Sequence, residues 1–362
     1  MNLLLAEIRR NPLLWLLVFV PVVFAAAKLK PEAHTALFVL SVLAIVPLAA
    51  LLSHATESVA ARTGDAVGGL LNATLGNLTE LVIALTALSA GQYVLVKASI
   101  AGAIVTNTLF MLGGSFLLGG LKFHVQEFNR VSARMQTSLL FLATVALLVP
   151  SVVGVDSAAA GAFTQKLSLG LAVLLIVVYA LGMLFSLKTH RELFASAKHA
   201  ADGEAPWPLA LALATLAGVT VLVALVSEIF VESVQKAAEA FGMTPAFVGF
   251  IVVALVGAAA EMASAFSGAR KNRLDLSVGI ALGSASQIAL FVAPLLVLLS
   301  YVIGPTPMDL QFWPGAVAMM LIATLTATLV TTGGRSAWFV GLLVLTVYVI
   351  FAMTLYLLPP GV

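Results

Sequence analysis

Long apolar segments joined by short polar connections dominate this sequence. A helix needs about 20 apolar residues to cross the hydrocarbon core of a bilayer. On that basis the sequence predicts eleven spans, near residues 12–29, 34–56, 66–90, 95–120, 133–153, 163–187, 207–231, 244–269, 274–303, 310–331 and 336–358. Only 9% of the residues are charged, whereas a soluble domain carries about 25%. The sequence therefore predicts an all-α polytopic membrane protein.

The first apolar segment has two interpretations. Arg9 and Arg10 precede residues 13–27, which end in three alanines, as a signal peptide with a small-residue cleavage site does. The alternative is a retained span that ends beside Lys28 and Lys30. We expect the retained span, because polytopic proteins rarely need a cleaved signal.

Basic residues divide unequally between the two sides of this topology. With the N-terminus inside, 13 Lys and Arg residues fall on the inner side and 5 on the outer side. Cytoplasmic connections carry such an excess, so we expect the N-terminus in the cytoplasm and the C-terminus outside. We expect a prokaryotic cytoplasmic membrane, with the lipid bilayer as a partner. The net charge of +2, without a basic run, argues against a nucleic-acid partner.

Two acidic residues, Glu80 and Glu261, lie near the middle of the third and eighth predicted spans, 181 positions apart. Each ends the pattern AxxGxxxE, at residues 73–80 and 254–261. An ionised side chain at membrane depth costs about 2.5–3.5 kcal/mol on insertion scales, so it indicates a functional site. Equivalent places in a duplicated chain indicate one shared site built from two halves.

The same offset of 181 residues aligns further positions: Gly68 with Gly249, Ala84 with Ala265, Gly102 with Gly283, Leu109 with Leu290 and Phe110 with Phe291. Small residues also recur by chance in apolar helices. The shift of five spans is odd, so the copies are expected in opposite orientations, as inverted-topology repeats in a 1+5+5 arrangement. The predicted parts are an N-terminal transmembrane helix at 1–30, a five-helix repeat at 31–187, a cytoplasmic linker at 188–206 and a second five-helix repeat at 207–362.

Polar residues gather around both glutamates. The helix faces that carry the glutamates hold Gly69, Asn72, Gly76 and Asn77 on the third span, and Gly257, Ser264 and Gly268 on the eighth. The glycines either permit close helix packing or let the helix unwind and free carbonyls for an ion. The following spans add Ser99, Thr106, Asn107, Ser284, Ser286 and Gln287. A lone Ser or Thr usually bonds its own helix, so Asn107 and Gln287 are the better candidates.

All the candidate ligands offer oxygen. The chain has no cysteine, and no histidine lies at this depth, which favours a hard cation such as Ca²⁺. The candidate ligands are Glu80, Glu261, Asn77, Thr79, Asn107, Gln287 and Ser284. A divalent cation or two protons neutralise the pair, whereas the bare carboxylates repel each other. If only the neutral forms switch access, cation and proton must exchange.

Other ionisable groups lie near the ends of the predicted spans. Glu57, Glu228 and Glu232 are candidate funnel acids that gather cations, although solvated helix-end charges are an equally good interpretation. Asp275 is predicted as a helix N-cap. His54, His124, His190 and His199 are expected in or near polar connections, and His34 opens the second span; we assign none of them a metal.

Two segments resemble a known family. Residues 69–88, GLLNATLGNLTELVIALTAL, resemble the first signature repeat of the cation/proton exchangers, the CAX branch of the Ca²⁺/cation antiporter superfamily. Residues 271–300 resemble the segment that follows the second signature, and the similarity covers residues 34–358. The resemblance implies a Ca²⁺/H⁺ antiporter without a cofactor, with Glu80 and Glu261 as the central ligands. It also implies that Asn107 and Gln287 line the pathway.

The chain departs from this family at several positions. Ala258 and Met262 stand where the second signature, GNAAEH, has asparagine and histidine, and Val340 stands where a glutamate is usual. The segment 188–204 carries more base than acid, whereas the family often has an acidic helix there. These departures put the affinity, the ion selectivity or the proton path of one half-site in doubt.

Two other functions also fit the sequence. A sodium-coupled exchanger of the same superfamily and a cation channel would both use these carboxylates. An intramembrane enzyme is not expected, because the sequence has no nucleophile–base pair and no HExxH motif. Nothing in the sequence predicts an oligomeric state.

Overall fold

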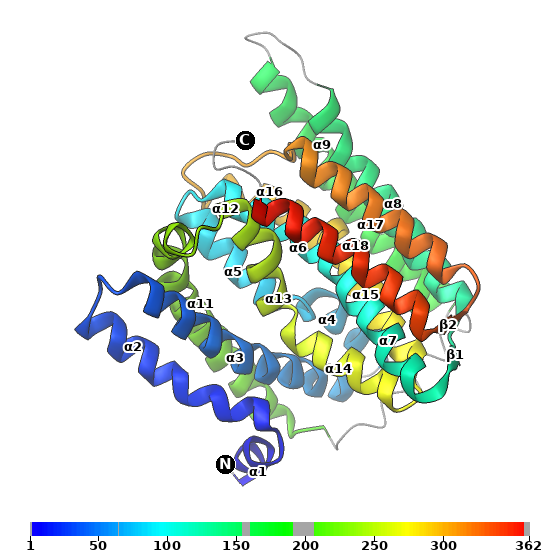
Figure 1. Cartoon of the computed structure of the whole chain (residues 1–362), viewed down its shortest axis with the longest axis horizontal. Helices are drawn as coiled ribbons and strands as arrows, with labels where there is room; N and C mark the ends of the chain where they lie inside the picture. The colour runs from blue at the N-terminus through cyan, green and yellow to red at the C-terminus, as the bar shows by residue number, and fades with distance from the viewer. Residues whose placement is uncertain (1, 64, 154–159, 191–205, 358–362) are drawn as a thin grey trace.

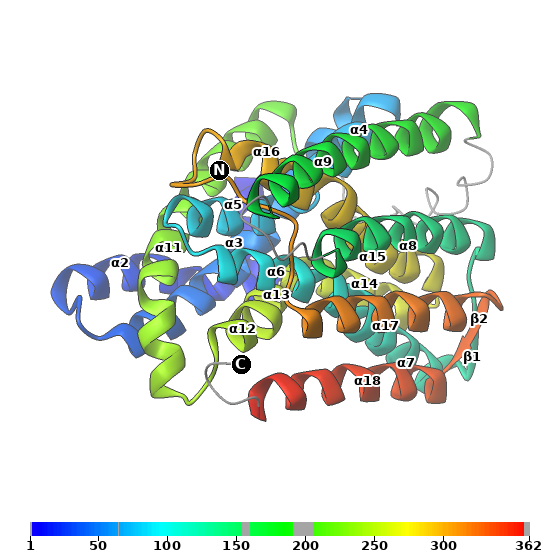
Figure 2. The same cartoon turned by 90° about the horizontal axis from the view of Figure 1, so that it is seen from above.

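The computed structural model describes residues 2–63, 65–153, 160–190 and 206–357. These residues form a bundle of α-helices (Figure 1). A short antiparallel sheet pairs β1 (Val125–Glu127) with β2 (Arg335–Ala337). The sheet lies at the end of the molecule opposite α2 (Figure 2).

Nine helices in the described ranges are long and apolar enough to cross a membrane. They are η1 (Pro12–Val18) with α2 (Phe19–Leu29); α3 (His34–Arg62); α6 (Tyr93–Val105) with η2 (Thr106–Met111) and α7 (Leu112–Phe123); α8 (Arg130–Val152); α9 (Ala160–Leu184) with η3 (Phe185–Thr189); α11 (Leu209–Ala240); α15 (Leu274–Gln287) with η6 (Ile288–Val292) and α16 (Ala293–Ser300); α17 (Pro314–Thr331); and α18 (Trp338–Leu357). A further short helix, α1 (Asn2–Arg10), precedes them. The prediction of an all-α polytopic membrane protein is confirmed, and the count of eleven spans stays a prediction.

The two predicted spans that carry the glutamates are broken helices. The third consists of α4 (Asp65–Leu75) and α5 (Leu78–Ser89), which are separated at Gly76 and Asn77. The eighth consists of α12 (Pro245–Phe247), η5 (Val248–Val253), α13 (Ala254–Gly257) and α14 (Ala259–Arg270), and it bends by 59° at Ala258. The helices are therefore interrupted at Gly76 and directly after Gly257, whereas Gly69 and Gly268 lie inside α4 and α14.

Two helices extend well beyond their predicted ends. α3 continues to Arg62 and α11 to Ala240, so Glu57, Glu228 and Glu232 lie within helices and not at their ends. The prediction used apolar length alone, but a helix can continue past the hydrocarbon core where its polar residues meet water. His54 lies in α3, and its ring packs on Trp207, in the connection before α11, with the centroids 4.4 Å apart. His199 and most of the predicted linker lie outside the described residues.

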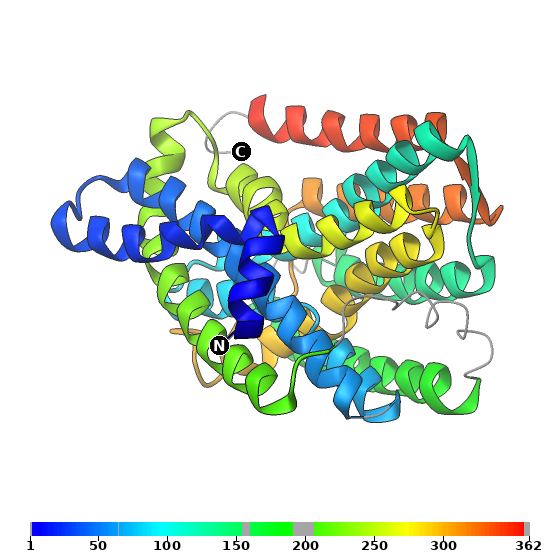
Figure 3. The ribbon, with the colours of Figure 1, turned by 90° about the horizontal axis from the view of Figure 1, so that it is seen from below.

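α2, α3 and α11 form one group of helices. α3 packs along α11, and α2 packs against α3 (Figures 1 and 3). Phe38 of α3 stacks on Phe230 of α11, with 5.4 Å between the ring centroids. The broken helices lie between this group and the helices α7, α8, α17 and α18 (Figure 1).

The connection between α7 and α8 holds the turn between α14 and α15. The amide of Gln126 donates to Asn272 Oδ1 at 2.9 Å and to the carbonyl of Ala269 at 3.0 Å. The carboxylate of Asp275 accepts from the backbone N–H of Asn129. The predicted N-cap role of Asp275 is therefore wrong: α15 begins after Arg273, and the carboxylate bonds to a neighbouring connection instead.

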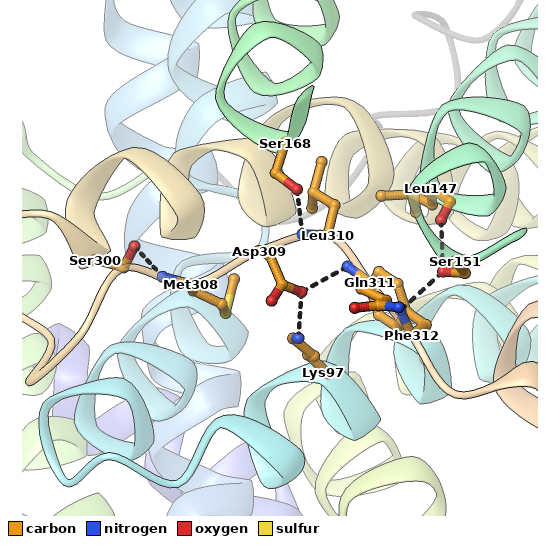
Figure 4. Close-up of polar contacts among 10 residues, drawn as sticks. All are labelled: Lys97, Leu147, Ser151, Ser168, Ser300, Met308, Asp309, Leu310, Gln311 and Phe312. Atoms are coloured by element: carbon orange, nitrogen blue, oxygen red, sulfur yellow. Dashed lines mark hydrogen bonds and ion pairs between the residues drawn. The ribbon is translucent and has the colours of Figure 1, made fainter. Parts of the chain in front are cut away.

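The connection between α16 and α17 holds the beginning of α6 in a similar way. Lys97 forms an ion pair with Asp309 at 2.6 Å, and the hydroxyl of Tyr93 donates to the carbonyl of Thr306 at 2.6 Å. Figure 4 shows three serine hydroxyls, of Ser151, Ser168 and Ser300, each accepting a backbone N–H of this connection. An offset of 181 carries residues 124–130 onto 305–311. Each proposed repeat thus holds the turn of the other, as expected of copies in opposite orientations.

α6 and η5 cross at backbone contact. A Cβ atom on Gly102 would lie 2.1 Å from the carbonyl oxygen of Phe250. A side chain there would force the helices apart, so this glycine fixes how α6 lies against the broken eighth span.

We predict that Gly102→Ala destabilises the fold by about 1–3 kcal/mol, because overpacking must be relieved by movement of a backbone. Gly283→Ala is the matched control, since it is the repeat equivalent and its Cβ would meet nothing within 4 Å. Thermal unfolding of the detergent-solubilised variants measures the difference. Equal melting temperatures for the two variants would contradict the packing described here.

Candidate functional site

Glu80 and Glu261 occupy equivalent places in the two broken helices. Glu80 lies in the first turn of α5, which begins after Asn77, and Glu261 lies in the first turn of α14, which begins after Ala258. The N-terminus of a helix carries a partial positive charge that stabilises an anion in its first turn. Each break therefore supplies a favourable electrostatic position for one carboxylate.

The structure brings the two glutamates together across the repeats. A Cβ atom on Gly257 would lie 2.9 Å from Glu80 Cγ and 3.4 Å from Glu80 Oε1. The side chain of Glu80 thus rests on the glycine at the break of the other repeat. Glu80 and Glu261 are close enough to repel each other electrostatically. The two side chains therefore lie near each other, and their use as one shared site stays a prediction.

Three oxygen atoms at this position are buried and unpaired. Within the described residues, Glu80 Oε1, Glu261 Oε2 and Asn107 Oδ1 have no hydrogen-bond partner. Buried acceptors are nearly always bonded, since leaving one unsatisfied costs about 1–3 kcal/mol. These oxygens are suited to bind a cation or, at the carboxylates, a proton.

A cavity of about 410 Å³ reaches Glu261. Its lining includes Glu57 of α3, Asn72 of α4 and Ser264 of α14, all of which are exposed. Glu57 and Glu261 therefore line the same cavity. The other candidate funnel acids, Glu228 and Glu232, are exposed on α11 and do not line this cavity.

A chain of hydrogen bonds runs beside the pair. Asn107 Nδ2 donates to Ser284 Oγ at 2.8 Å, and Ser284 Oγ donates to Asn77 Oδ1 at 2.6 Å. Asn77 Nδ2 then donates to Gln287 Oε1. All four side chains are buried, and Thr79 is buried close by in the first turn of α5. Four of the predicted site residues therefore contact one another directly.

The remaining polar candidates bond elsewhere. Ser99 donates to the carbonyl of Val96 at 2.8 Å, and Ser286 donates to the carbonyl of Gln136 at 3.1 Å. The hydroxyl of Thr106 lies 3.4 Å from that of Tyr348 on α18. Tyr348 was not found from the sequence, because a single tyrosine in an apolar span gives no pattern.

The helices that follow the breaks share a second feature that the sequence did not predict. Their hydrogen-bonding widens to π-helical turns at η2 and η6, one segment in each proposed repeat. Such turns are frequent at functional sites. Asn107 lies inside η2, and Gln287 directly precedes η6. The hydrophobic pattern carries no signal for this local geometry.

The three departures from the resembled family lie together. Ala258 and Met262 belong to one buried apolar cluster, and Val340 packs against it. The cluster also contains Met111 and Phe116, from η2 and α7. Positions far apart in the sequence thus form one apolar wall beside α14.

We predict that Gly257→Ala weakens the apparent affinity for Ca²⁺ by about tenfold, since the new methyl group displaces Glu80; a tenfold change corresponds to about 1.4 kcal/mol. Gly279→Ala is the control, because Gly279 lines the cavity but its Cβ would meet nothing within 4 Å. Binding of radioactive Ca²⁺ to the purified variants measures both. Unchanged affinity in Gly257→Ala would show that the contact with Glu80 does not matter.

The chain is similar to known proteins over most of its length. The family described as "Sodium/calcium exchanger protein" matches residues 33–188 and 211–357. The chain is 39% identical to the Ca(2+)/H(+) antiporter of Aphanothece halophytica, covering 95% of this chain and 96% of that protein. It is 40% identical to the Ca(2+)/H(+) antiporter ChaA of Bacillus subtilis strain 168, covering 89% and 92%.

Solved structures share the fold. The structure of native YfkE superimposes with a TM-score of 0.83 at 36% sequence identity, covering 96% of this chain and all of that chain (100%). The H⁺/Ca²⁺ exchanger CAX has the same fold, with a TM-score of 0.71 at 16% identity, covering 97% and 88%. With a family match across most of its length, the chain belongs to the sodium/calcium exchanger protein family.

Proposed function

We propose that this protein is a secondary active antiporter that exchanges Ca²⁺ for H⁺ across a membrane by alternating access. The observation that carries the proposal is the pair Glu80 and Glu261, in equivalent first turns, each with a buried, unpaired oxygen. Relatives about 40% identical to the chain are named Ca(2+)/H(+) antiporters, which supports the proposal. Ca²⁺ and H⁺ are the substrates, and the proposal needs neither a cofactor nor a catalytic residue.

The exchange follows from charge balance at the pair. Bare carboxylates in a poorly solvated place repel each other and lack the hydration they would have in water. Binding of one Ca²⁺, or of protons, removes the repulsion and compensates for the lost hydration. If the protein changes access only in these neutral forms, each cation that leaves is replaced by protons. Glu80, Glu261 and the free Asn107 Oδ1 are the proposed central ligands, with Thr79, Ser284, Asn77 and Gln287 around them.

The cavity defines the open side under the predicted topology. Its lining includes Ser132 at the start of α8, Leu187 near the end of η3 and Asp275 at the start of α15. These helix ends are cytoplasmic if the N-terminus is inside. We therefore assign the described geometry to an inward-facing state in a cytoplasmic membrane, with the two five-helix repeats enclosing the site.

Glu57 is the proposed funnel acid of this side. It is exposed, accepts from Ser53 Oγ at 3.2 Å and lines the same cavity as Glu261. A carboxylate in a narrow polar cavity raises the local concentration of cations. Glu228 and Glu232 would serve the opposite side when the site opens there.

Two rival functions use the same carboxylates. A sodium-coupled exchanger would require Na⁺ for Ca²⁺ movement, whereas the relatives named above are proton antiporters. A cation channel would pass Ca²⁺ without coupled proton movement. Ca²⁺ transport that is driven by a pH gradient in the absence of Na⁺ distinguishes the proposal from both.

We predict that Glu80→Gln and Glu261→Gln each lower Ca²⁺-driven proton flux by on the order of a hundredfold, because the affinity for Ca²⁺ depends on the number of charged ligands. Glu57→Gln should raise the KM for Ca²⁺ about two- to threefold without changing the maximal rate, as loss of electrostatic steering does. Glu239→Gln, exposed on α11, is the control. Coupled flux that survives either central substitution would overturn the proposed site.

The absence of cysteine allows a direct test of orientation. A cysteine at Val302, which is 84% exposed between α16 and α17, is predicted outside. A cysteine at Glu127, in β1, is predicted inside. A membrane-impermeant maleimide should label Val302→Cys in intact cells and Glu127→Cys only after the membrane is opened. The reverse pattern would show that the orientation is wrong.

A further inference from the structure

Tyr348 is a buried tyrosine of α18 whose hydroxyl contacts a different helix. The threonines on either side of it in α18, Thr346 and Thr354, donate to carbonyls of their own helix. The Tyr348 hydroxyl lies 3.4 Å from the hydroxyl of Thr106, the first residue of η2, and either group can donate to the other. Both side chains are buried. A phenylalanine would fill the same space, so the hydroxyl indicates a polar role, as buried tyrosine hydroxyls usually do.

Tyr348 also contacts a second residue of the same π-helical turn. Its ring lies 5.1 Å from the ring of Phe110, measured between the centroids. Thr106 precedes Asn107 in η2 and Phe110 follows it, so one side chain contacts η2 on both sides of the proposed ligand. Asn107 Oδ1 is buried without a hydrogen-bond partner among the described residues. Contacts that hold η2 therefore also set the direction in which this oxygen points.

The helix that carries Tyr348 is itself fixed close to this segment. α18 packs along α7 (Figure 1), and a Cβ atom on Gly341 would lie 2.3 Å from the backbone nitrogen of Leu117. Gly341 and Tyr348 are seven residues apart, which places them on one face of α18. The backbone contact at Gly341 thus holds that face against the helix that continues from η2.

We propose that Tyr348 is a positioning residue for Ca²⁺ binding, which holds η2 through Thr106 and Phe110 so that Asn107 presents Oδ1 to the cation. The inference rests on the proposed exchange and adds a supporting group from a helix outside the ligand set. Its hydroxyl contacts Thr106, which is not a proposed ligand, so Tyr348 acts through η2 and not on the cation. Such support matters because ligands must be held to within about 0.5 Å of their binding geometry.

The π-helical turn of the other proposed repeat gives a comparison. In η6 the ring of Phe291 stacks on Tyr179 of α9, with 5.5 Å between the centroids. The position equivalent to Asn107 is Ile288, whose side chain has no oxygen. Both turns therefore pack on a tyrosine ring from the opposite repeat, and the contact between two hydroxyls lies beside the turn that carries an amide.

Loss of the hydroxyl should weaken Ca²⁺ binding without slowing transport at saturating Ca²⁺. We expect Tyr348→Phe to raise the Kd for Ca²⁺ about threefold, within the range that one hydrogen bond contributes, and to leave the maximal flux unchanged. Thr106→Val removes the other partner and should raise the Kd by the same factor, whereas Thr106→Ser keeps a hydroxyl and should keep the wild-type Kd. Binding of radioactive Ca²⁺ to purified protein and Ca²⁺-driven proton flux in proteoliposomes measure the two quantities.

Two double variants distinguish positioning from a general loss of stability. If the two hydroxyls act on each other, Tyr348→Phe with Thr106→Val raises the Kd about threefold, whereas independent effects would raise it about ninefold. If they act through Asn107, adding Tyr348→Phe to Asn107→Ala changes the Kd no further. Tyr356→Phe, which alters an exposed tyrosine of the same helix, is the matched control and should bind Ca²⁺ as the wild type does.

Each other outcome is decisive. A wild-type Kd in Tyr348→Phe, multiplied effects in the first double variant, a further loss on the Asn107→Ala background or a weakened control overturns this role and leaves the exchange intact. If Tyr348→Phe does not reach the membrane, equal Kd values for Thr106→Val and Thr106→Ser overturn it. A wild type that binds Ca²⁺ without coupled flux overturns the exchange but not the positioning, and a wild type that binds no Ca²⁺ overturns both.

Discussion

The structure depends on keeping two carboxylates together in a place that water reaches poorly. Each carboxylate has a buried oxygen without a partner in the described residues, and the two groups repel each other. The first turns of α5 and α14 offset part of this cost with the positive ends of two helices. The part of this cost that the helices do not offset favours the binding of a cation or of protons to the two carboxylates. This preference is the physical basis of the proposed exchange.

The surrounding helices keep this geometry by contacts between the two halves of the chain. Gly257 of one break supports Glu80 of the other, and Gly102 brings α6 to backbone contact with η5. Lys97 with Asp309 holds one turn, while Gln126 with Asn272 holds the other. The two proposed repeats differ at the chain of hydrogen bonds. Asn77 bonds Ser284 and Gln287, whereas Ala258, at the equivalent position, lies in the apolar cluster beside α14. The two glutamates are therefore expected to play unequal parts.

The sequence predicted the features that depend on pattern. Apolar length gave the fold class, and a repeated AxxGxxxE gave the pair that the structure brings together. The sequence did not predict features that depend on contacts in the folded protein. Asp275 bonds to Asn129 in a neighbouring connection instead of capping α15. The helices α3 and α11 continue beyond the apolar segments from which their ends were predicted. The grouping of Ala258, Met262 and Val340 could not be read either, because only the fold brings these positions together.

In the proposed exchange, protons and a cation occupy the same pair of carboxylates. The most direct measurement counts the protons released when Ca²⁺ binds to the purified protein in detergent, without any gradient. We expect release of about two protons per Ca²⁺ at acidic pH, fewer as pH rises, and none in the Glu80→Gln, Glu261→Gln double variant. Ca²⁺ binding without proton release at any pH, or release that persists in the double variant, would contradict it.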